Sequence, residues 1–471
     1  MAVQLKTTMT NDANKLAPAY SDIVIYAENI PQGIINLYNV KYICQVYINN
    51  VLIATLKAPL DNYNKAIFRI ASILQDYTET DKSGYDLDGI YSTFGNNNMQ
   101  SVNHSIHQID KFARNRNNLK NCYCIGGYEY SNTPSGTIIQ SLSLADALNP
   151  QVSFNFFNSV LQHNAGYSTE DFSDYLLTGG TKKFLTKFPQ NFAGTGLSGQ
   201  KIQAGQYHTL AFLNGKHYLD SKVTRIRIRT YNSSDTLLAT QYVDNTTLNG
   251  GAPFGSSITA TVNGGDNTNE GLLYFGCGTA QIIQYGVSLT NVAYYTVTAL
   301  NVNSNVSKVY YFTIQDADCK GFETIRLAFL NSLGAWDYYN FTKKSVRKTQ
   351  INKTAIKQNY GTIPYQATTV LGDIFNFDYY NQGTYDGGTR AFNVNAIETI
   401  EANTDFITED EAAILEELFL SPDVYMQTGS TFEPVVINET EYIKQTTAND
   451  MLKQYIITVE KGHNTRVQRL W

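Results

Sequence analysis

Charged residues are scarce in this chain of 471 residues: Asp, Glu, Lys and Arg together make up only 16% of it. A typical globular protein has about 25%. The net charge is −6, and a weakly acidic chain is a poor match for non-specific binding to nucleic acid or to an anionic membrane. We therefore expect neither nucleic acid nor a membrane among the partners of the protein.

Cysteine is also scarce. The chain contains an odd number of them, scattered at Cys44, Cys122, Cys124, Cys277 and Cys319. This pattern argues against a disulfide framework. Cys122 and Cys124 lie on one face of an expected strand, but the sequence offers no second pair that would complete a zinc site. We expect structural thiols and no metal.

Long hydrophobic runs are missing as well. No segment approaches the roughly 18 apolar residues of a membrane-spanning helix. The opening residues, MAVQLKTTMTNDANKLAP, lack the apolar core of a secretion signal. We therefore expect a soluble protein that is made in a cytoplasm.

Catalytic and cofactor motifs are not found either. There is no G-x-S-x-G elbow, no Walker motif and no G-x-G-x-x-G opening a helix. His104 and His107 form a close pair, but their surroundings are Asn- and Ser-rich and lack the apolar shell of a metal site. Asp86 and Asp88 begin like a calcium loop whose bidentate Glu is missing. The chain is predicted to be no enzyme and to need no cofactor.

What the chain has instead is tyrosine, 34 residues of it, with many polar uncharged residues and 42% hydrophobic residues. This composition favours β-strands with wide polar surfaces, and Tyr is also common at protein interfaces. The spacing of strand and turn signals predicts a mainly β protein with several β-sandwich domains, fibronectin III-like or immunoglobulin-like, and a small α+β C-terminal region.

Four regions are expected along the chain. They are an N-terminal β-sandwich (1–85), an Asn-rich connecting region with additional strands (86–200), a second β-sandwich (201–320) and a C-terminal α+β region (321–471). The second sandwich includes a long Gly- and Asn-rich loop at 245–271. Such a loop is either mobile or ordered against a partner.

Four local patterns predict individual elements. Residues 40–60 alternate as a hairpin with its turn at Asn49-Asn50. Residues 66–77 begin as a strand and become a short helix. Residues 408–423 form the clearest helix, which opens with a capping box and stops at a proline. The segments 434–438 and 454–462 are expected to pair as strands.

The segment RLAFLNSLGAWDYYNFTKKS, residues 326–345, contains one of the two tryptophans. Its pattern predicts a strand, a turn at 331–334 and a returning strand. Trp336 then packs into a corner, contacts another subunit or forms a ligand platform. Asp337 has no carboxylate or histidine near it in sequence, which argues against acid–base chemistry.

Three arginines are predicted to project from one face of a strand, because Arg225, Arg227 and Arg229 alternate with Thr and Ile. Such a row is either a solvated face or one half of an intermolecular contact. The full set of candidate interface or packing residues is Trp336, Tyr338, Tyr339, Arg225, Arg227, Arg229 and Trp471.

A second aromatic segment, LGDIFNFDYYNQGTYDGG at 371–388, suits sugar binding, since aromatic rings stack on pyranose rings while Asp and Asn bond hydroxyl groups. The candidate glycan contacts are Asp378, Tyr379, Tyr380 and Tyr385. Glycoside hydrolysis would need two facing carboxylates, whose geometry the sequence does not supply.

Several segments resemble virion structural proteins of tailed bacteriophages that infect Bacteroidetes-type hosts. The matching stretches are KYICQVYINNVLIATLKAPLDN…FRIASILQDYTETD (41–81), HSIHQIDKFARNRNNLKN (104–121), KKFLTKFPQN (182–191), IRLAFLNSLGAWDYYNFTKKS (325–345) and ELFLSPDVYM…PVVINETEYIKQ…LKQYIITVEKG (417–462). They keep a consistent order over most of the chain and contain no catalytic motif.

The resemblance implies a structural subunit of the phage tail, at the tail tip, the baseplate or another tail assembly. Such a subunit is made in the bacterial host and ends up in the virion. It would contact other virion proteins and form a homo-oligomer, a trimer or hexamer ring, through β-rich interfaces. The alternative function is a host-surface carbohydrate-binding module of the tail that recognises the receptor.

Overall fold

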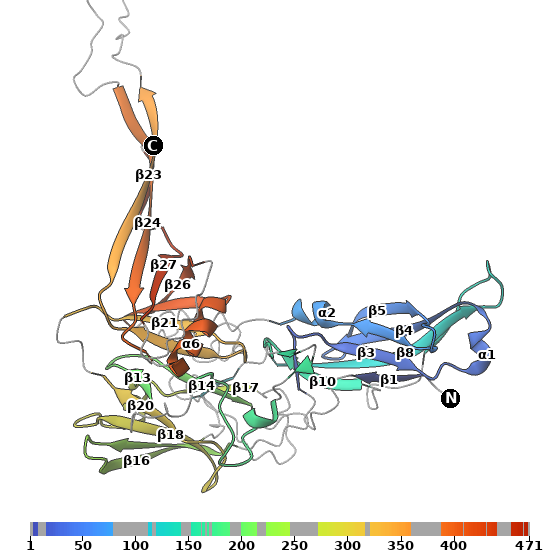
Figure 1. Ribbon diagram of the computed structural model, residues 1–471, viewed down its shortest axis with the longest axis horizontal. Helices are drawn as coiled ribbons and strands as arrows, with labels where there is room; N and C mark the ends of the chain where they lie inside the picture. The colour runs from blue at the N-terminus through green and yellow to red at the C-terminus, as the bar shows by residue number, and fades with distance from the viewer. Residues whose placement is uncertain are drawn as a thin grey trace, which may run out of the picture.

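The computed structural model of the chain describes residues 3–7, 16–78, 112–114, 119–142, 152–161, 163–164, 167–168, 172–188, 199–213, 223–244, 272–315, 321–358, 388–407, 409–429, 431–439, 454–464 and 466–469. The expected fold class is confirmed: these residues form mainly β-strands in several sheets, with few helices. Figure 1 shows an N-terminal lobe beside a larger lobe, and a long arm that leaves the larger lobe.

The N-terminal lobe is a β-sandwich. One sheet has the order β1-β3-β6, with β1 (Gln4–Thr7), β3 (Val24–Glu28) and β6 (Ala66–Arg69). The other has the order β2-β10-β8-β4-β5 and carries β9 beside β8, with β2 (Leu16–Pro18), β4 (Tyr38–Ile48), β5 (Val51–Pro59), β8 (Lys120–Ser131), β9 (Ile139–Leu142) and β10 (Val152–Phe157). Every second residue of β4, such as Cys44 and Val46, packs between the sheets together with Phe68.

The hairpin expected at 40–60 is confirmed, since β4 and β5 pair antiparallel from Ile48↔Val51 onward. Asn49 and Asn50 both have positive φ, at 47° and 67°. A two-residue turn between twisted strands requires positive φ at both positions, and Asn tolerates it better than most residues. The expected strand and short helix are confirmed as β6 and α2 (Ala71–Gln75). A further short helix, α1 (Gln32–Ile35), precedes β4.

The second sandwich lies in the larger lobe. Its six-stranded sheet has the order β13-β20-β18-β15-β16 with β19 beside β18, and its three-stranded sheet has the order β14-β17-β7. The strands are β7 (Phe112–Arg114), β13 (Gln200–Ile202), β14 (Thr209–Leu213), β15 (Arg225–Tyr231), β16 (Leu237–Asp244), β17 (Leu272–Gly276), β18 (Tyr294–Asn301), β19 (Ser304–Asn305) and β20 (Tyr310–Ile314). The short elements outside these sheets are β11 (His163–Asn164), β12 (Tyr167–Ser168), η3 (Phe172–Tyr175), α5 (Thr279–Ile282) and η5 (Ile283–Tyr285), of which β11 and β12 pair with each other.

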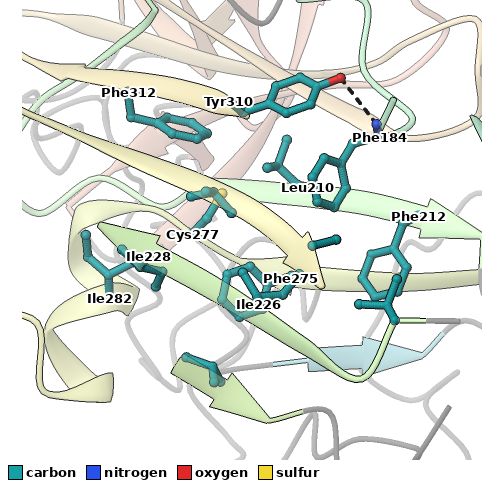
Figure 2. Packing of buried hydrophobic residues seen from close by; sticks show 14 of the residues in the cluster. Phe184, Leu210, Phe212, Ile226, Ile228, Phe275, Cys277, Ile282, Tyr310 and Phe312 are labelled. Atoms are coloured by element: carbon teal, nitrogen blue, oxygen red, sulfur yellow. Dashed lines mark hydrogen bonds between the residues drawn. The ribbon is translucent and has the colours of Figure 1, made fainter. Parts of the chain in front are cut away.

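Figure 2 shows the core of this sandwich, where Phe212 and Phe275 of the small sheet face Ile226 of the large one. The loop that carries Phe184 closes one side. The backbone N–H of Phe184 donates a hydrogen bond of 3.2 Å to the hydroxyl of Tyr310. A buried Tyr thus satisfies a loop amide while its ring fills the core.

The C-terminal sheet is eight-stranded, with the order β22-β21-β25-β26-β27-β24-β23 and β28 beside β24. Its strands are β21 (Ile325–Leu330), β22 (Trp336–Phe341), β23 (Val346–Gln358), β24 (Gly388–Asn403), β25 (Val424–Thr428), β26 (Thr431–Ile437), β27 (Ile456–Lys461) and β28 (Arg466–Arg469). The strand pair expected at 434–438 and 454–462 is confirmed, since β26 and β27 pair antiparallel. The expected strand–turn–strand at 325–341 is confirmed as β21 and β22.

One face of this sheet is covered by α6 (Glu409–Leu420), the helix expected from the sequence. Leu415 and Leu418 lie on one side of the helix and pack against Ile400 and Val459 of the sheet. The expected capping residue Thr408 lies outside the described residues.

A further core joins the lobes. Phe212 and Leu210 point into the second sandwich, whereas the alternate residues of β14 point the other way, toward the C-terminal sheet. There they meet Trp336, whose side chain is 1% exposed, and Phe157 of the N-terminal lobe reaches the same core. The three-stranded sheet is therefore buried on both faces, which matches the continuous apolar runs of β14 and β17.

In the N-terminal half, strands from the expected connecting region (86–200) pair with strands of the two sandwiches. β8 and β10, which lie within 86–200, pair with β4 and β2 and complete the N-terminal sandwich. β7, from the same region, joins the three-stranded sheet of the second sandwich. A strand's own pattern of residues does not identify its neighbour when that neighbour is distant in sequence.

Trp336→Ala should lower the free energy of unfolding by about 3–5 kcal/mol, because truncating a fully buried aromatic leaves a cavity. Denaturant unfolding with near-ultraviolet circular dichroism measures this. Tyr63→Ala is the matched control, since Tyr63 is 83% exposed, and its effect should stay within about 0.5 kcal/mol. Equal stability of the two variants would contradict the packing role of Trp336.

Candidate functional site

The turn between β21 and β22 is where the lobes meet. Gly334 has a φ of +75°, and a Cβ built on it would lie 2.0 Å from the carbonyl oxygen of Asn158 in the N-terminal lobe. Only glycine suits both the left-handed conformation and this close approach. The backbone N–H of Val160 donates a 2.7 Å hydrogen bond to the carbonyl of Ser332. The turn therefore attaches the N-terminal lobe to the larger one.

The same turn is held from the other side by α6. The backbone N–H and hydroxyl of Ser332 donate to the Glu417 carboxylate at 2.8 and 3.0 Å. Lys187 lies 3.8 Å from that carboxylate. Asn331 donates to the backbone carbonyl of Leu185 at 3.3 Å. The turn at residues 331–334 thus contacts helix α6, the loop that contains Leu185 and the N-terminal lobe.

Asp337 follows the corner and is completely buried. Its carboxylate accepts hydrogen bonds from the Thr186 hydroxyl at 2.5 Å, the Lys187 backbone N–H at 3.0 Å and the Asn331 side-chain amide at 2.8 Å. Burial raises the pKa of Asp337 to about 6, although the three donors pull it downward and the charge of Glu417 adds to the increase.

Arg326 is buried on the other face of the hairpin, and its hydrogen-bond partners among the described residues include no carboxylate. It donates to the backbone carbonyl of Tyr207 at 2.7 and 3.2 Å and to the side-chain oxygen of Asn340 at 2.8 Å. Its guanidinium also stacks on the Tyr338 ring, 4.9 Å from the centroid. Burial lowers the pKa of Arg326 to about 10, so the group stays charged at neutral pH.

His208 lies beside that guanidinium, 3.2 Å from it. Burial, followed by the charge of Arg326, holds the pKa of His208 well below its usual value, so the imidazole is neutral. With neutral His208, the contact assigns Nδ1 as acceptor and places the proton on Nε2. The cluster links the residues just before β14 to β21 and β22.

This arrangement is suited to holding strands together and poorly suited to reacting with a substrate. Arg326, His208 and Asp337 are all buried. The cleft next to them, lined by Tyr339, Asn340 and Glu411 among others, has about 20 Å³ of space open to water, whereas ligand pockets are on the order of 300 Å³ or larger. Among the described residues, no group of His, Cys, Asp and Glu could hold a metal ion.

The structure places the candidate packing residues on both sides of β22. Trp336 and Tyr338 are buried in the core that joins the lobes, and Trp336 meets Tyr425 edge-on at 5.5 Å. Tyr339 points the other way and packs against the core under α6. Trp336 is therefore a packing residue within one chain.

The arginine row lies on β15 as expected, with Ile226 and Ile228 buried beneath it. Arg225 is 3.0 Å from Asp244 and stacks over a Tyr ring, and Arg227 donates to Asn305 at 3.2 Å. Burial, followed by the charge of Arg229, lowers the pKa of Arg227. The row is half-buried, and its role as a contact between molecules stays a prediction.

The other predicted site residues lie outside the described residues: Asp378, Tyr379, Tyr380, Tyr385, Trp471, the 245–271 loop, His104, His107, Asp86 and Asp88. Sequence reasoning missed Arg326, and it considered Asp337 only for acid–base chemistry and not as a buried hydrogen-bond acceptor. Both are charged residues inside apolar strands, and that feature of the sequence could have marked them as buried polar groups.

The open surface of the larger lobe is dominated by the arm. β24 has sixteen residues and pairs with β23 along nearly its whole length. The body strand β27 pairs only with residues 399–403, and β28 pairs with 393–396. Among the described strands, β23 has no second neighbour. Most of its residues are exposed, so the arm presents an open strand edge and two accessible faces.

Comparisons with known proteins identify no family. No protein-family model matches the sequence, and no curated protein matches it either. Among solved structures, a mutant of Salmonella alpha-2-macroglobulin aligns with 8% identity and a TM-score of 0.15. The alignment covers 100% of this chain, which spans only 34% of that protein. A TM-score this low carries no argument about fold or function. Within the described residues, no helix has the length and apolar character needed to span a membrane.

Asp337 should make stability depend on pH. Because its folded-state pKa is about 6 against an ordinary 3.8, the folded protein holds the proton more tightly than the unfolded one. The resulting stabilisation is complete below the ordinary value and is lost as pH rises through about 6, with a magnitude of about 3 kcal/mol.

Asp337→Asn cannot titrate and should remove this component when stability is measured from pH 4 to pH 8. Asp174→Asn is the control, since its side chain is 61% exposed and should leave the wild-type pH dependence intact. An unchanged pH profile for Asp337→Asn would contradict the assignment.

Gly334→Ala should weaken the attachment of the N-terminal lobe. The positive φ alone costs a non-glycine residue roughly 1–2 kcal/mol, and the clash with Asn158 adds to that. Gly205→Ala is a matched control, because Gly205 has a φ of +77° and nothing within 4 Å of the point where a methyl group would lie. Thermal unfolding should therefore show the larger loss for Gly334→Ala. Equal losses would mean that the contact with Asn158 is unimportant.

Proposed function

We propose that this chain is a structural subunit of a tailed-bacteriophage virion, in the tail tip, the baseplate or another part of the tail. In this role, copies associate with one another and with other virion proteins through β-rich surfaces. The proposal rests on one observation above all, the long arm formed by β23 and β24.

The arm suits a subunit that reaches toward a neighbour. Sixteen strand residues extend about 50 Å at about 3.3 Å each, and Figure 1 shows β23 and β24 running away from the lobes. A two-stranded ribbon is only marginally stable on its own. Ile351 and Val467 on the arm are exposed. A partner that covers the ribbon would bury these side chains and satisfy the open edge of β23.

The larger lobe supplies a firm base for such an arm. β24 continues from the arm into the sheet that α6 covers, and the core around Trp336 joins that sheet to both sandwiches. A chain with few charges and many tyrosines can stay soluble and still have a low desolvation cost when a partner covers its surface. The reason is that Tyr costs less free energy to desolvate than Lys or Glu.

The segments that carry the phage resemblance fall on parts of the scaffold. Residues 41–81 include most of β4 and all of β5, β6 and α2, and residues 325–345 include β21 and β22. Residues 417–462 include β25, β26 and β27. Residues of this kind maintain a fold, which supports a structural role for the chain.

The proposal predicts that the chain is present in purified phage particles in threefold or sixfold multiples, as a ring of subunits requires. Quantitative mass spectrometry of gradient-purified particles measures the copy number, and gold-labelled antibodies locate the protein along the tail. An established capsid protein serves as the positive control and an early, non-virion phage protein as the negative control. Absence from particles while the chain is abundant in infected cells would refute the proposal.

A further inference from the structure

The C-terminal sheet has one face that the described residues leave uncovered. α6 packs on the face that contains Ile400 and Val459. Val436 lies on the opposite face and is 58% exposed, and Ile456 on that face is 61% exposed. In the strand register, Glu460 of β27 lies directly across from Val436 of β26. Thr458 precedes Glu460 by two residues and therefore points to the same face. Glu401 of β24 lies directly across from Thr458, so it shares this face as well. The uncovered face therefore combines apolar side chains with two carboxylates and one cation, because Lys348 lies opposite Thr399 on this face and pairs with Glu401.

The distal half of the arm combines apolar side chains with cations. It consists of residues 351–358, 388–396 and 466–469, which contain Lys353, Lys357, Arg390, Arg466 and Arg469 and no Asp or Glu. Strand register puts Ile351, Lys353, Lys357 and Arg466 on one side of the ribbon. Nearer the body, this side of the sheet is the one that α6 covers, because Arg347 lies opposite Ile400.

The proximal half of the arm differs because its charges are balanced within the chain. Arg347 lies 2.6 Å from both Glu323 and Glu398, and Lys348 pairs with Glu401. The change along the ribbon, from paired charges near the body to cations alone farther out, marks the distal half as the part that suits an acidic partner. Lysines on an edge strand also repel an identical strand, which disfavours pairing of two β23 edges.

We propose that the distal half of the arm of one copy lies against the uncovered face of the C-terminal sheet of another copy. This inference rests on the proposed function, since it specifies the partner of the assembly arm. Ile351 of the arm would lie near Val436 and Ile456. Lys353 and Lys357 would lie near Glu460 and near Glu401, whose carboxylate they would share with Lys348 of its own copy. Complementary charges of this kind fix register and orientation between subunits.

The charge of the whole chain favours a second copy over nucleic acid. Without the five cations of the distal arm, the chain has 30 cations against 41 acids and a net charge of −11. That excess repels a polyanion while it attracts the arm of a neighbour. One side of the sheet in the first copy meets the other side in the second, so the contact is heterologous and repeats from copy to copy, as in a ring.

Reciprocal charge reversal in the full-length chain tests the contact. The arm variant is Lys353→Glu with Lys357→Glu, and the face variant is Glu401→Lys with Glu460→Lys. Each variant alone should self-associate about tenfold or more weakly than the wild type. Mixing the two should restore association, because the acidic arm of one variant then meets the basic face of the other.

Sedimentation velocity at low and high salt measures the association, and wild-type binding should weaken as salt is added. Arg69→Glu is the control, because the Arg69 side chain is 74% exposed on the N-terminal lobe, and its association should match the wild type. Circular dichroism verifies that each variant is folded.

Three outcomes would overturn the proposal: a wild-type chain that stays monomeric at low salt, an arm variant that associates like the wild type, or a mixture that fails to associate. Binding of duplex DNA by a monomeric wild type, lost in the arm variant, would identify nucleic acid as the partner instead. A monomeric chain that is present in virions would refute only this contact. A self-associating chain absent from virions would refute only the proposed tail role.

Discussion

The small three-stranded sheet is buried on both of its faces, and this burial holds the lobes of the protein together. β14 and β17 turn alternate side chains into the second sandwich and into the core around Trp336. That core also receives Phe157 from the N-terminal lobe and Ala328 from the C-terminal sheet. Since apolar burial is the main favourable term in folding, the units cannot separate without exposing the side chains that hold each of them together.

Two buried charged side chains fix the positions of the segments that meet around Trp336. Arg326 and Asp337 carry opposite charges and lie on neighbouring strands. The hydrogen bonds of each side chain are nevertheless made by its own set of neutral partners. Burying charge without an opposite charge is costly unless its hydrogen bonds are complete. The partners come from the 186–187 loop, from Tyr207 and from the 331 turn, so these segments must occupy fixed places before either charge is accommodated. Gly334 then allows the N-terminal lobe to approach closely.

On the surface of the larger lobe, charges near the body are paired within the chain, as Lys348 is with Glu401, whereas the distal half of the arm has cations and no acidic residue. The arm carries cations far from the body, and the uncovered face of the sheet carries carboxylates beside exposed Val436 and Ile456. In the proposed contact, the cations of the distal arm of one copy would meet the carboxylates on the uncovered face of another. Low overall charge limits the desolvation that such an assembly requires.

Four features could be predicted from the sequence: the β class, the hairpin at Asn49-Asn50, the corner before Trp336 and helix α6. These features depend on alternation, turn residues and helical spacing, which are local properties. Three other features follow from contacts between distant segments: β8 and β10 complete the N-terminal sandwich, Asp337 accepts a hydrogen bond from Thr186, and Arg326 donates to Tyr207. These partners lie far apart in sequence, and their meeting depends on which faces of the sheets stack, which no local pattern encodes.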